Sequence, residues 1–275
     1  MKEYILPILI FLGFGALSGI LLLIASKVLA VKTDETEAKI TEALPGANCG
    51  GCGYSGCAGY AAAVAHDGAP TNLCKPGGAD VMKKINAIMG TEGGEFIREV
   101  AYVRCNGCEK ATKDRFTFTG TKSCAAVEKF YNGKGECRFG CDGYGDCAAV
   151  CSNDAITITD GVAVVDSAKC GGCGKCVTAC PNHLIFLRKE TSTVALRCSS
   201  KDSGKVTRTV CTNGCIGCKI CEKKCPHGAV IVADNHAVID YDKCTSCGTC
   251  VSACPRKCLV NITCTHSEKA EQADK

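Results

Sequence analysis

Large aromatic side chains are scarce in this sequence of 275 residues, which contains no tryptophan and only 5 % aromatic residues. A conventional core of large apolar side chains therefore has little material here. Cysteine is abundant instead, at 27 positions. In a short secreted chain this density would indicate a disulfide scaffold, but here the cysteines recur in CxxCxxCxxxCP arrays, which are typical of iron–sulfur ligation. Because ligation free energy becomes folding free energy, bound clusters can hold such a chain together.

Motifs of nucleotide-binding and hydrolytic enzymes are also missing. The sequence has no Gly-rich dinucleotide fingerprint, no Walker loop and no HExxH, and no nucleophile–base constellation, so we predict no catalytic residue. The formal charge of +4 omits the thiolates. Six four-iron sites at roughly −2 each would bring the net charge to about −8. With no basic run interleaved with aromatics, we expect no nucleic-acid partner.

The N-terminal segment has no charged residue from Tyr4 to Ser26, and Lys27 is followed by another apolar stretch, from Val28 to Val31. That length can span a hydrocarbon core of ~30 Å. We therefore predict a single-pass transmembrane anchor in residues 1–31. A cleaved signal peptide is the weaker alternative, because its apolar region runs only ~7–15 residues. Lysines after the segment favour a cytoplasmic location for the rest of the chain at the cell membrane.

The remaining chain divides by its cysteines into an α+β architecture. We expect a stalk in residues 32–48, with a short exposed helix from Thr33 to Leu44 that ends at Pro45. A small 4Fe–4S domain should follow, then two tandem modules that each resemble a bacterial ferredoxin with two 4Fe–4S clusters, and a disordered charged tail. The corresponding ranges are 49–100, 101–190 with additional cysteines, 191–264, and 265–275.

An internal repeat defines the two modules. A shift of 74 residues superposes nine cysteines, beginning with Cys124 on Cys198. The segments AITITDGVAVVD and AVIVADNHAVID align under the same shift, and each predicts a strand, a turn and a strand. We infer two copies of one module.

In two-cluster ferredoxins, three cysteines of one array and the fourth cysteine of the other hold each cluster. The second copy follows this rule, and structural zinc is a weak alternative for it. Its predicted ligand sets are Cys215, Cys218, Cys221 and Cys254 for one cluster, and Cys244, Cys247, Cys250 and Cys225 for the other.

The first copy departs from the pattern at Tyr144, which stands where the second copy has Cys218. One cluster is complete, with Cys170, Cys173, Cys176 and Cys151. The other keeps Cys141, Cys147 and Cys180 and lacks a fourth ligand. We expect Cys137 to replace it; a three-iron cluster and an empty site are the alternatives.

A separate array precedes the repeat, with the spacing C-x2-C-x4-C-x16-C. Nearby glycines let backbone amides approach the sulfurs, and Ala58 to Ala65 predicts a small helix. Zinc and redox disulfides are the alternatives to a cluster here. The predicted ligands are Cys49, Cys52, Cys57 and Cys74.

Seven cysteines remain outside these sets. Cys258 aligns with Leu184 and is interpreted as a small buried apolar residue, and Cys264 is expected to be free. Four of the other five could hold one further cluster, for a total of about six 4Fe–4S clusters, although scattered structural thiols are an open alternative. These five are Cys105, Cys108, Cys124, Cys198 and Cys211.

The motif LPGANCGGCGYSGCAGYA after an uncharged anchor, followed by ferredoxin repeats, resembles the B subunits of Rnf electron-transport complexes. The segment CTNGCIGCKICEKKCP resembles their extended, cluster-rich version in anaerobes. The resemblance implies an electron-transfer subunit of an ion-translocating ferredoxin:NAD+ oxidoreductase. In that family this subunit accepts electrons from soluble ferredoxin and passes them toward a flavin- and NAD-binding subunit among other membrane subunits.

Two other functions stay open from the sequence. One is a membrane-tethered polyferredoxin that serves a hydrogenase or a redox-sensor reductase, and the other is a metal-storage protein. If the chain is the electron-transfer subunit, the short stalk should keep the domain containing Cys49 and Cys74 near the membrane. We therefore expect electrons to enter at the C-terminal modules and to leave through that domain.

Overall fold

The computed structural model describes residues 12–24, 35–92 and 94–262. Residues 12–24 are helical and exposed. Within these ranges, no helix combines the length and the apolar character that a membrane crossing requires. The other residues of the predicted anchor and the predicted tail lie outside the described residues.

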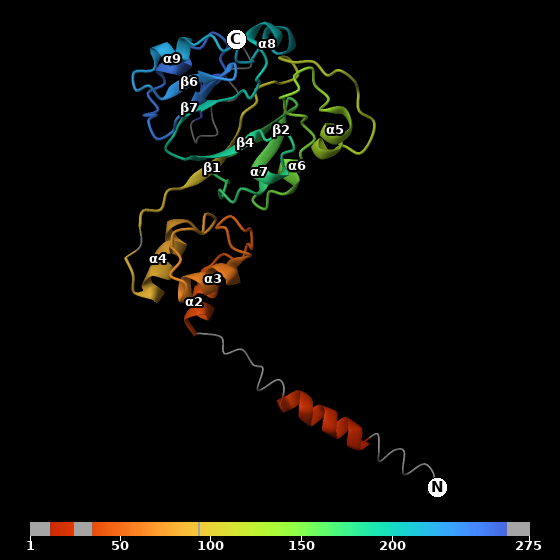
Figure 1. Ribbon diagram of the computed structural model, residues 1–275, viewed down its shortest axis with the longest axis vertical. Helices are drawn as coiled ribbons and strands as arrows, with labels where there is room; N and C mark the ends of the chain where they lie inside the picture. The colour runs from red at the N-terminus through yellow and green to blue at the C-terminus, as the bar shows by residue number, and fades with distance from the viewer. Residues whose placement is uncertain (1–11, 25–34, 93, 263–275) are drawn as a thin grey trace, which may run out of the picture.

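The first domain contains three helices, which lie together at one end of the body in Figure 1. They are α2 (Glu35–Ala43), α3 (Cys57–His66) and α4 (Gly78–Met89). Ile40 of α2 and Ile85 of α4 are both 0 % exposed, and Tyr60 of α3 packs in the same core. The helix expected over residues 33–44 therefore forms, but the expectation that it is exposed is wrong. Ile40 and Leu44, four residues apart, lie on one helical face and are both buried against the domain.

Each ferredoxin-like copy contains two antiparallel strand pairs. The first copy pairs β1 (Glu99–Val103) with β4 (Ile185–Lys189) and β2 (Ile156–Thr159) with β3 (Val162–Val165). The second pairs β5 (Val194–Leu196) with β8 (Leu259–Asn261) and β6 (Val230–Ala233) with β7 (His236–Ile239). Short helices begin after the cysteine loops: α6 (Asp146–Ala149), α7 (Lys175–Ala179), α9 (Ile220–Lys224) and α10 (Thr249–Ser252).

The two strand–turn–strand units predicted from the repeat are confirmed as the pairs β2–β3 and β6–β7. Their turns place two consecutive residues in the left-handed region, with φ of 49° and 77° at Asp160 and Gly161, and 46° and 62° at Asp234 and Asn235. Aspartate, asparagine and glycine adopt this conformation most readily, and its twist suits a tight hairpin. The sequence signal was therefore a local one.

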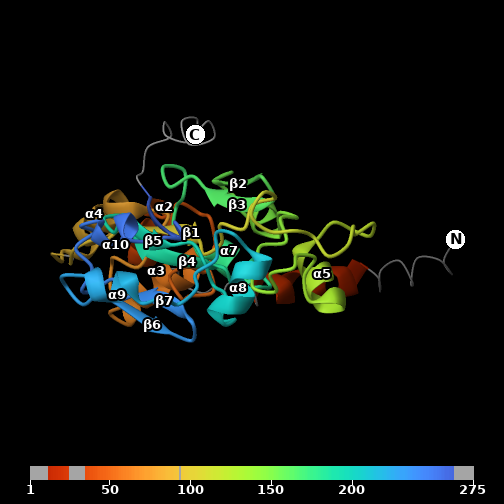
Figure 2. The same cartoon turned by 90° about the horizontal axis from the view of Figure 1, so that it is seen from above.

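Upstream of the cysteine arrays, the structural correspondence between the two copies differs from the shift of 74 residues. The backbone N–H of Arg104, after β1, donates to the carbonyl of Leu184 at 2.8 Å, and the N–H of Arg197, after β5, donates to that of Cys258 at 2.7 Å. Cys105 is thus the structural counterpart of Cys198, and the sequence alignment of Cys124 with Cys198 is wrong. The first copy has a longer connection before its array, which includes α5 (Cys124–Tyr131), whereas the second contains α8 (Gly204–Val210). Figure 2 shows α5 and α9 on opposite sides of the modules.

Candidate iron–sulfur centres

The predicted ligands of the first domain meet in one cavity, lined by Cys49, Cys52, Cys57 and Cys74. Asn48 holds the loop, because its Oδ1 accepts the N–H of Cys57 at 2.8 Å. Burial raises the pKa of Cys74, and the negative charges of the other three cysteines raise it further, although an N–H of Gly77 opposes them. This mutual repulsion shows that the four sulfurs are close neighbours.

Both predicted sets of the second copy also line cavities. Cys215, Cys218, Cys221 and Cys254 surround one, and Cys225, Cys244, Cys247 and Cys250 surround the other. Each set combines three cysteines of one array with the last cysteine of the other, as the sequence predicts. Cys218 and Cys247 are exposed, and they are the only exposed cysteines in the described part of the chain.

A fifth cysteine, Cys258, also lines the first of these cavities. Its Sγ lies 3.5 Å from Sγ of Cys254. The Cys258 thiol lowers the pKa of Cys254 to about 5 and that of Cys215 to about 6 by hydrogen bonding to both. These interactions raise the pKa of Cys258. A cysteine that holds a cluster is a thiolate without a hydrogen, so in the contact with Cys254 the donor is Cys258.

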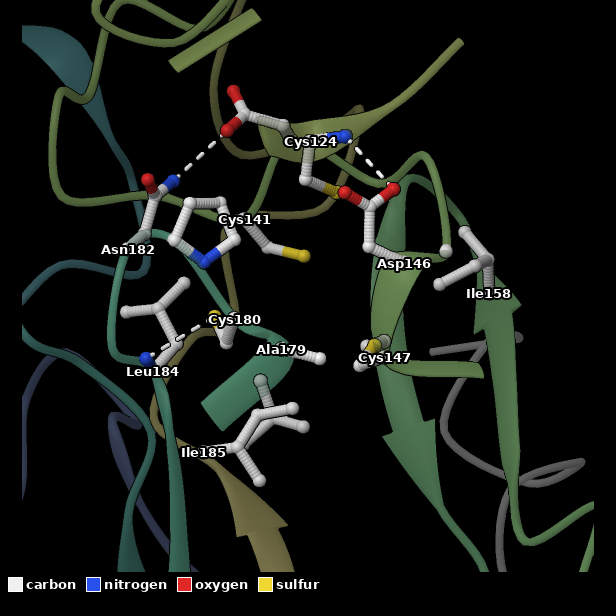
Figure 3. A pocket seen from close by; sticks show the side chains of 15 residues that line it. Cys124, Cys141, Asp146, Cys147, Ile158, Ala179, Cys180, Asn182, Leu184 and Ile185 are labelled. Atoms are coloured by element: carbon white, nitrogen blue, oxygen red, sulfur yellow. Dashed lines mark hydrogen bonds between the residues drawn. The ribbon is translucent and has the colours of Figure 1, made fainter. Parts of the chain in front are cut away.

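The first copy contains the site that departs from the sequence prediction. Its cavity is lined by Cys124, Cys141, Cys147 and Cys180, whose side chains surround the same space in Figure 3. The expectation that Cys137 completes this set is wrong, because the fourth cysteine that lines the cavity is Cys124. Burial, followed by the negative charges of Cys141, Cys124 and Cys180, raises the pKa of Cys147 to about 12.

Asp146 explains how Cys124 reaches the cavity. Its carboxylate accepts the backbone N–H groups of Cys124 and Ala125 and the hydroxyl of Ser123, each at 2.9 Å. One carboxylate thus fixes the start of α5 beside α6, on which Cys147 lies. Partial burial acts to raise the pKa of Asp146, but these three donors together lower it. The second copy has Ile220 at this position and its own Cys218.

The other predicted set of the first copy is Cys151, Cys170, Cys173 and Cys176. Burial, followed by the negative charges of Cys170 and Cys173, raises the pKa of Cys176 to about 12. Cys151 accepts the N–H of Ala155 at 3.3 Å, as its repeat partner Cys225 accepts that of Ala229 at 3.3 Å. The two sites therefore share the same local frame.

The remaining cysteines gather where the two copies meet. Asn213 donates to the carbonyl of Asn106 at 2.9 Å, and the N–H of Thr212 donates to that of Ala111 at 2.8 Å. Burial, together with the negative charges of neighbouring thiolates in the group, raises the pKa of Cys105 and of Cys137 to about 11. The group consists of Cys105, Cys108, Cys137, Cys198 and Cys211. The group between the copies thus contains Cys137 and not Cys124, which corrects the set of five candidate cysteines predicted from the sequence.

The donor chemistry of these sites fits 4Fe–4S clusters. Each is lined by soft sulfur donors from separate segments, and backbone N–H groups point at several sulfurs, where they stabilise the thiolate form. For example, Cys170 accepts the N–H of Ala101 at 3.3 Å. In the described residues, no group of three or more His, Cys, Asp or Glu side chains is arranged to hold a single metal ion.

Contacts link neighbouring sites along the molecule. A Cβ on Gly51 would lie 2.8 Å from the carbonyl oxygen of Cys173, so only glycine permits this close approach of the first domain to the first copy. Cys147 and Cys176 interact electrostatically. The N–H of Cys141 donates to Cys105 at 3.4 Å, and the N–H of Cys215 donates to Cys198 at 3.3 Å. The sites thus form a continuous row through both copies.

Four family models match the chain. One described as a putative Fe–S cluster matches residues 44–76, and two described as 4Fe–4S dicluster domains match residues 169–229 and 214–259. The fourth, described as the LdpA Fe–S cluster-binding domain, matches residues 134–191. These matches support iron–sulfur clusters in all three parts of the chain.

Three curated relatives are similar over nearly the whole chain, and each is the B subunit of its complex. That of the ion-translocating oxidoreductase complex of Methanosarcina acetivorans is 40 % identical, covering 90 % of this chain and 94 % of the relative. That of the Na+-translocating ferredoxin:NAD+ oxidoreductase complex of Acetobacterium woodii is 42 % identical, covering 94 % and 78 %. The counterpart from the proton-translocating complex of Clostridium ljungdahlii is 35 % identical, covering 93 % and 91 %.

The ligand set of the first copy predicts how the iron content changes when Cys124 is replaced. Six loaded sites give about 24 iron and 24 sulfide per chain, and C124A should lose about four of each. The double variant C124A/Y144C should regain them, because it places a cysteine where the second copy has Cys218. D146A keeps the Cys124 thiol but removes the carboxylate that accepts the backbone N–H of Cys124, so this variant should lose part of this iron.

The measurement is iron and acid-labile sulfide after anaerobic purification, with folding checked by circular dichroism. Full iron in C124A together with a loss in C137A would restore the ligand set expected from the sequence.

Proposed function

This chain belongs to the family of B subunits of ion-translocating oxidoreductase complexes, and from this membership we propose how it carries electrons. It is an electron-transfer subunit of an ion-translocating ferredoxin:NAD+ oxidoreductase complex, as the sequence resemblance implies. The observation that supports this electron-transfer role is the row of cysteine sites in contact from the first domain to the second copy. Its partners in our proposal are soluble ferredoxin and the membrane and flavin- and NAD-binding subunits.

A bound 4Fe–4S cluster supplies a site that takes up and releases one electron. The residues of this chain hold about six such sites, five by the sets above and the sixth by four of the five cysteines between the copies. Their N–H groups stabilise negative charge on the sulfurs, and the surrounding small apolar side chains exclude water. The chain supplies no group for NAD+ chemistry, which we assign to a partner subunit.

We propose that electrons enter at the second copy, next to Cys218. Exposed lysines flank this ligand at positions 219, 223 and 224, and Lys257 is exposed next to Cys254 and Arg256. The only acidic residue of α9, Glu222, accepts the N–H of Val232 at 3.3 Å. The first copy has Gly145, Ala149, Val150 and His183 at the four matching positions. A basic surface around an exposed cluster favours an acidic protein donor such as ferredoxin.

We propose that electrons leave through the first domain. Its cavity adjoins the first copy at the contact between Gly51 and Cys173, and Lys75 forms an ion pair with Glu99 at 2.9 Å across the same boundary. This domain also follows the N-terminal segment most closely in the sequence. An exit here delivers electrons beside the membrane subunits.

The entry proposal predicts that reversing charge beside Cys218 slows reduction by ferredoxin. In K219E/K223E/K224E we expect the second-order rate constant at low salt to fall by about tenfold or more, because electrostatic steering of this kind raises association rates by 10–10³. The difference should shrink at high salt, where charges are screened. Stopped-flow spectroscopy of the loaded chain measures it.

The matched control is K83E/K84E, which reverses two exposed lysines of α4 in the first domain. Its rate constant should remain near that of the wild type. Slow reduction of the control with normal reduction of the triple variant would place entry at the first domain.

The exit proposal predicts a division of activities in C52A. The clusters of both copies should still be reduced by ferredoxin, because their ligands are intact, while NAD+ reduction by the whole complex is lost. Electron paramagnetic resonance of the complex and the rate of NADH formation measure the two activities. Near wild-type NADH formation by C52A complexes that lack this cluster would show that the exit lies elsewhere.

We also propose that residues 4–31 form a single transmembrane anchor that holds the cluster domains on the cytoplasmic side of the cell membrane. Deleting them should give a chain that separates from the membrane fraction, keeps its full iron content and still accepts electrons from ferredoxin. Membrane fractionation and N-terminal sequencing of the cellular protein test this. A mature N-terminus near residue 31 would identify a cleaved signal peptide instead.

A further inference from the structure

Cys258 stands inside a cavity that already has its four ligands. Its side chain is 2 % exposed and lines the cavity beside Cys254, at 3.5 Å between the two Sγ atoms. Cys215 lines the same cavity. Two ligands of one cluster bind different irons, and so stand farther apart than two sulfurs in hydrogen-bonding contact. The close contact therefore indicates a donor to the ligands and not a further ligand.

The first copy offers a matched cavity with an apolar residue at this position, Leu184. The backbone frame is the same in both copies. The carbonyls of Leu184 and Cys258 accept equivalent arginine N–H groups at 2.8 and 2.7 Å. The N–H of Leu184 donates to Cys180 at 3.4 Å, and that of Cys258 donates to Cys254.

The other donors to the first cysteine of each array also match. Cys141 receives the N–H groups of Gly143 and Ala163, and Cys215 receives those of Gly217 and Ala237. Each of these pairs is related by the repeat shift of 74 residues. Among the cysteines and the donors compared here, the two cavities differ in one ligand, Cys124 against Cys218, and in one donor, the thiol of Cys258.

We propose that the Cys258 thiol is a built-in tuning group, which donates an S–H···S hydrogen bond to the sulfur of Cys254 and raises the reduction potential of the cluster that Cys254 holds together with Cys215, Cys218 and Cys221. Reduction adds negative charge to the cluster and its sulfurs, and a donor to those sulfurs stabilises the more negative state. The proposal rests on the proposed function only in requiring a 4Fe–4S cluster in this cavity.

The consequence concerns which cluster is reduced most readily. The tuned cluster includes the exposed ligand Cys218, and its counterpart in the first copy has Leu184 and no such thiol. Cys258 therefore makes the cluster nearest the basic surface a stronger electron acceptor than its backbone frame alone would produce.

The test is a redox titration of the full loaded chain with chemical reductants, followed by electron paramagnetic resonance. In C258V, which keeps a small apolar side chain but removes the donor, the signal of one cluster should move to more negative potential. We expect about a tenfold change in the reduction equilibrium, or about 59 mV for a one-electron couple. In C258S the hydroxyl still donates, so the potential should stay close to that of the wild type. Iron and sulfide should be unchanged in both.

The reciprocal variant L184C should raise the potential of the cluster held by Cys124, Cys141, Cys147 and Cys180. This variant also decides the question if C258V fails to load. An unshifted titration in fully loaded C258V, or in L184C, would overturn the proposal and leave Cys258 a packing residue.

A ligand role would show differently. If C254S keeps all its iron and C254S/C258V loses one cluster, Cys258 is a ligand in reserve and the tuning proposal is wrong. Because these titrations need neither ferredoxin nor the partner subunits, their result is independent of the proposed direction of electron flow.

Discussion

The structure depends on the convergence of cysteine sulfurs from separate segments into shared cavities. Each ferredoxin-like copy has only short helices and two-stranded sheets, and isolated two-stranded sheets are marginal in water. The cavities connect the ends of each copy, because the last cysteine of one array joins cysteines of the other. Even the apolar cores contain cysteines beside small aliphatic side chains. Ligation energy can therefore replace the missing burial of aromatic side chains.

Duplication of one module gives a row of sites, and divergence between the copies makes the two ends of that row different. The first copy packs against the first domain, and its connection carries α5 with an additional ligand. The second copy keeps the regular ligand set, exposes Cys218 and Cys247, and places lysines next to one of them. Equivalent backbone frames can thus serve different positions in an electron-transfer chain, because a few side chains set exposure, charge and hydrogen bonding.

Much of this protein could be predicted from its sequence because the relevant constraints are local. The arrays identify iron–sulfur ligation, and their spacing assigns the sets at Cys49 to Cys74 and throughout the second copy, which the structure brings together in cavities. The hairpins follow from turn residues that tolerate positive φ. The motif after the N-terminal segment carries the family resemblance, which similarity over most of the chain supports.

Only the tertiary structure decided the features that depend on residues far apart in sequence or on unequal connections. A constant shift aligned Cys124 with Cys198, but the pairing of β1 with β4 and β5 with β8 makes Cys105 the counterpart of Cys198. A carboxylate 22 residues away, that of Asp146, brings Cys124 into the cavity. Cys137 instead joins the cysteines between the copies. Cys258 lines one cavity with Cys215, which belongs to a distant part of the sequence. Spacing specifies which cysteines can share a loop, whereas packing determines which loops share a cavity.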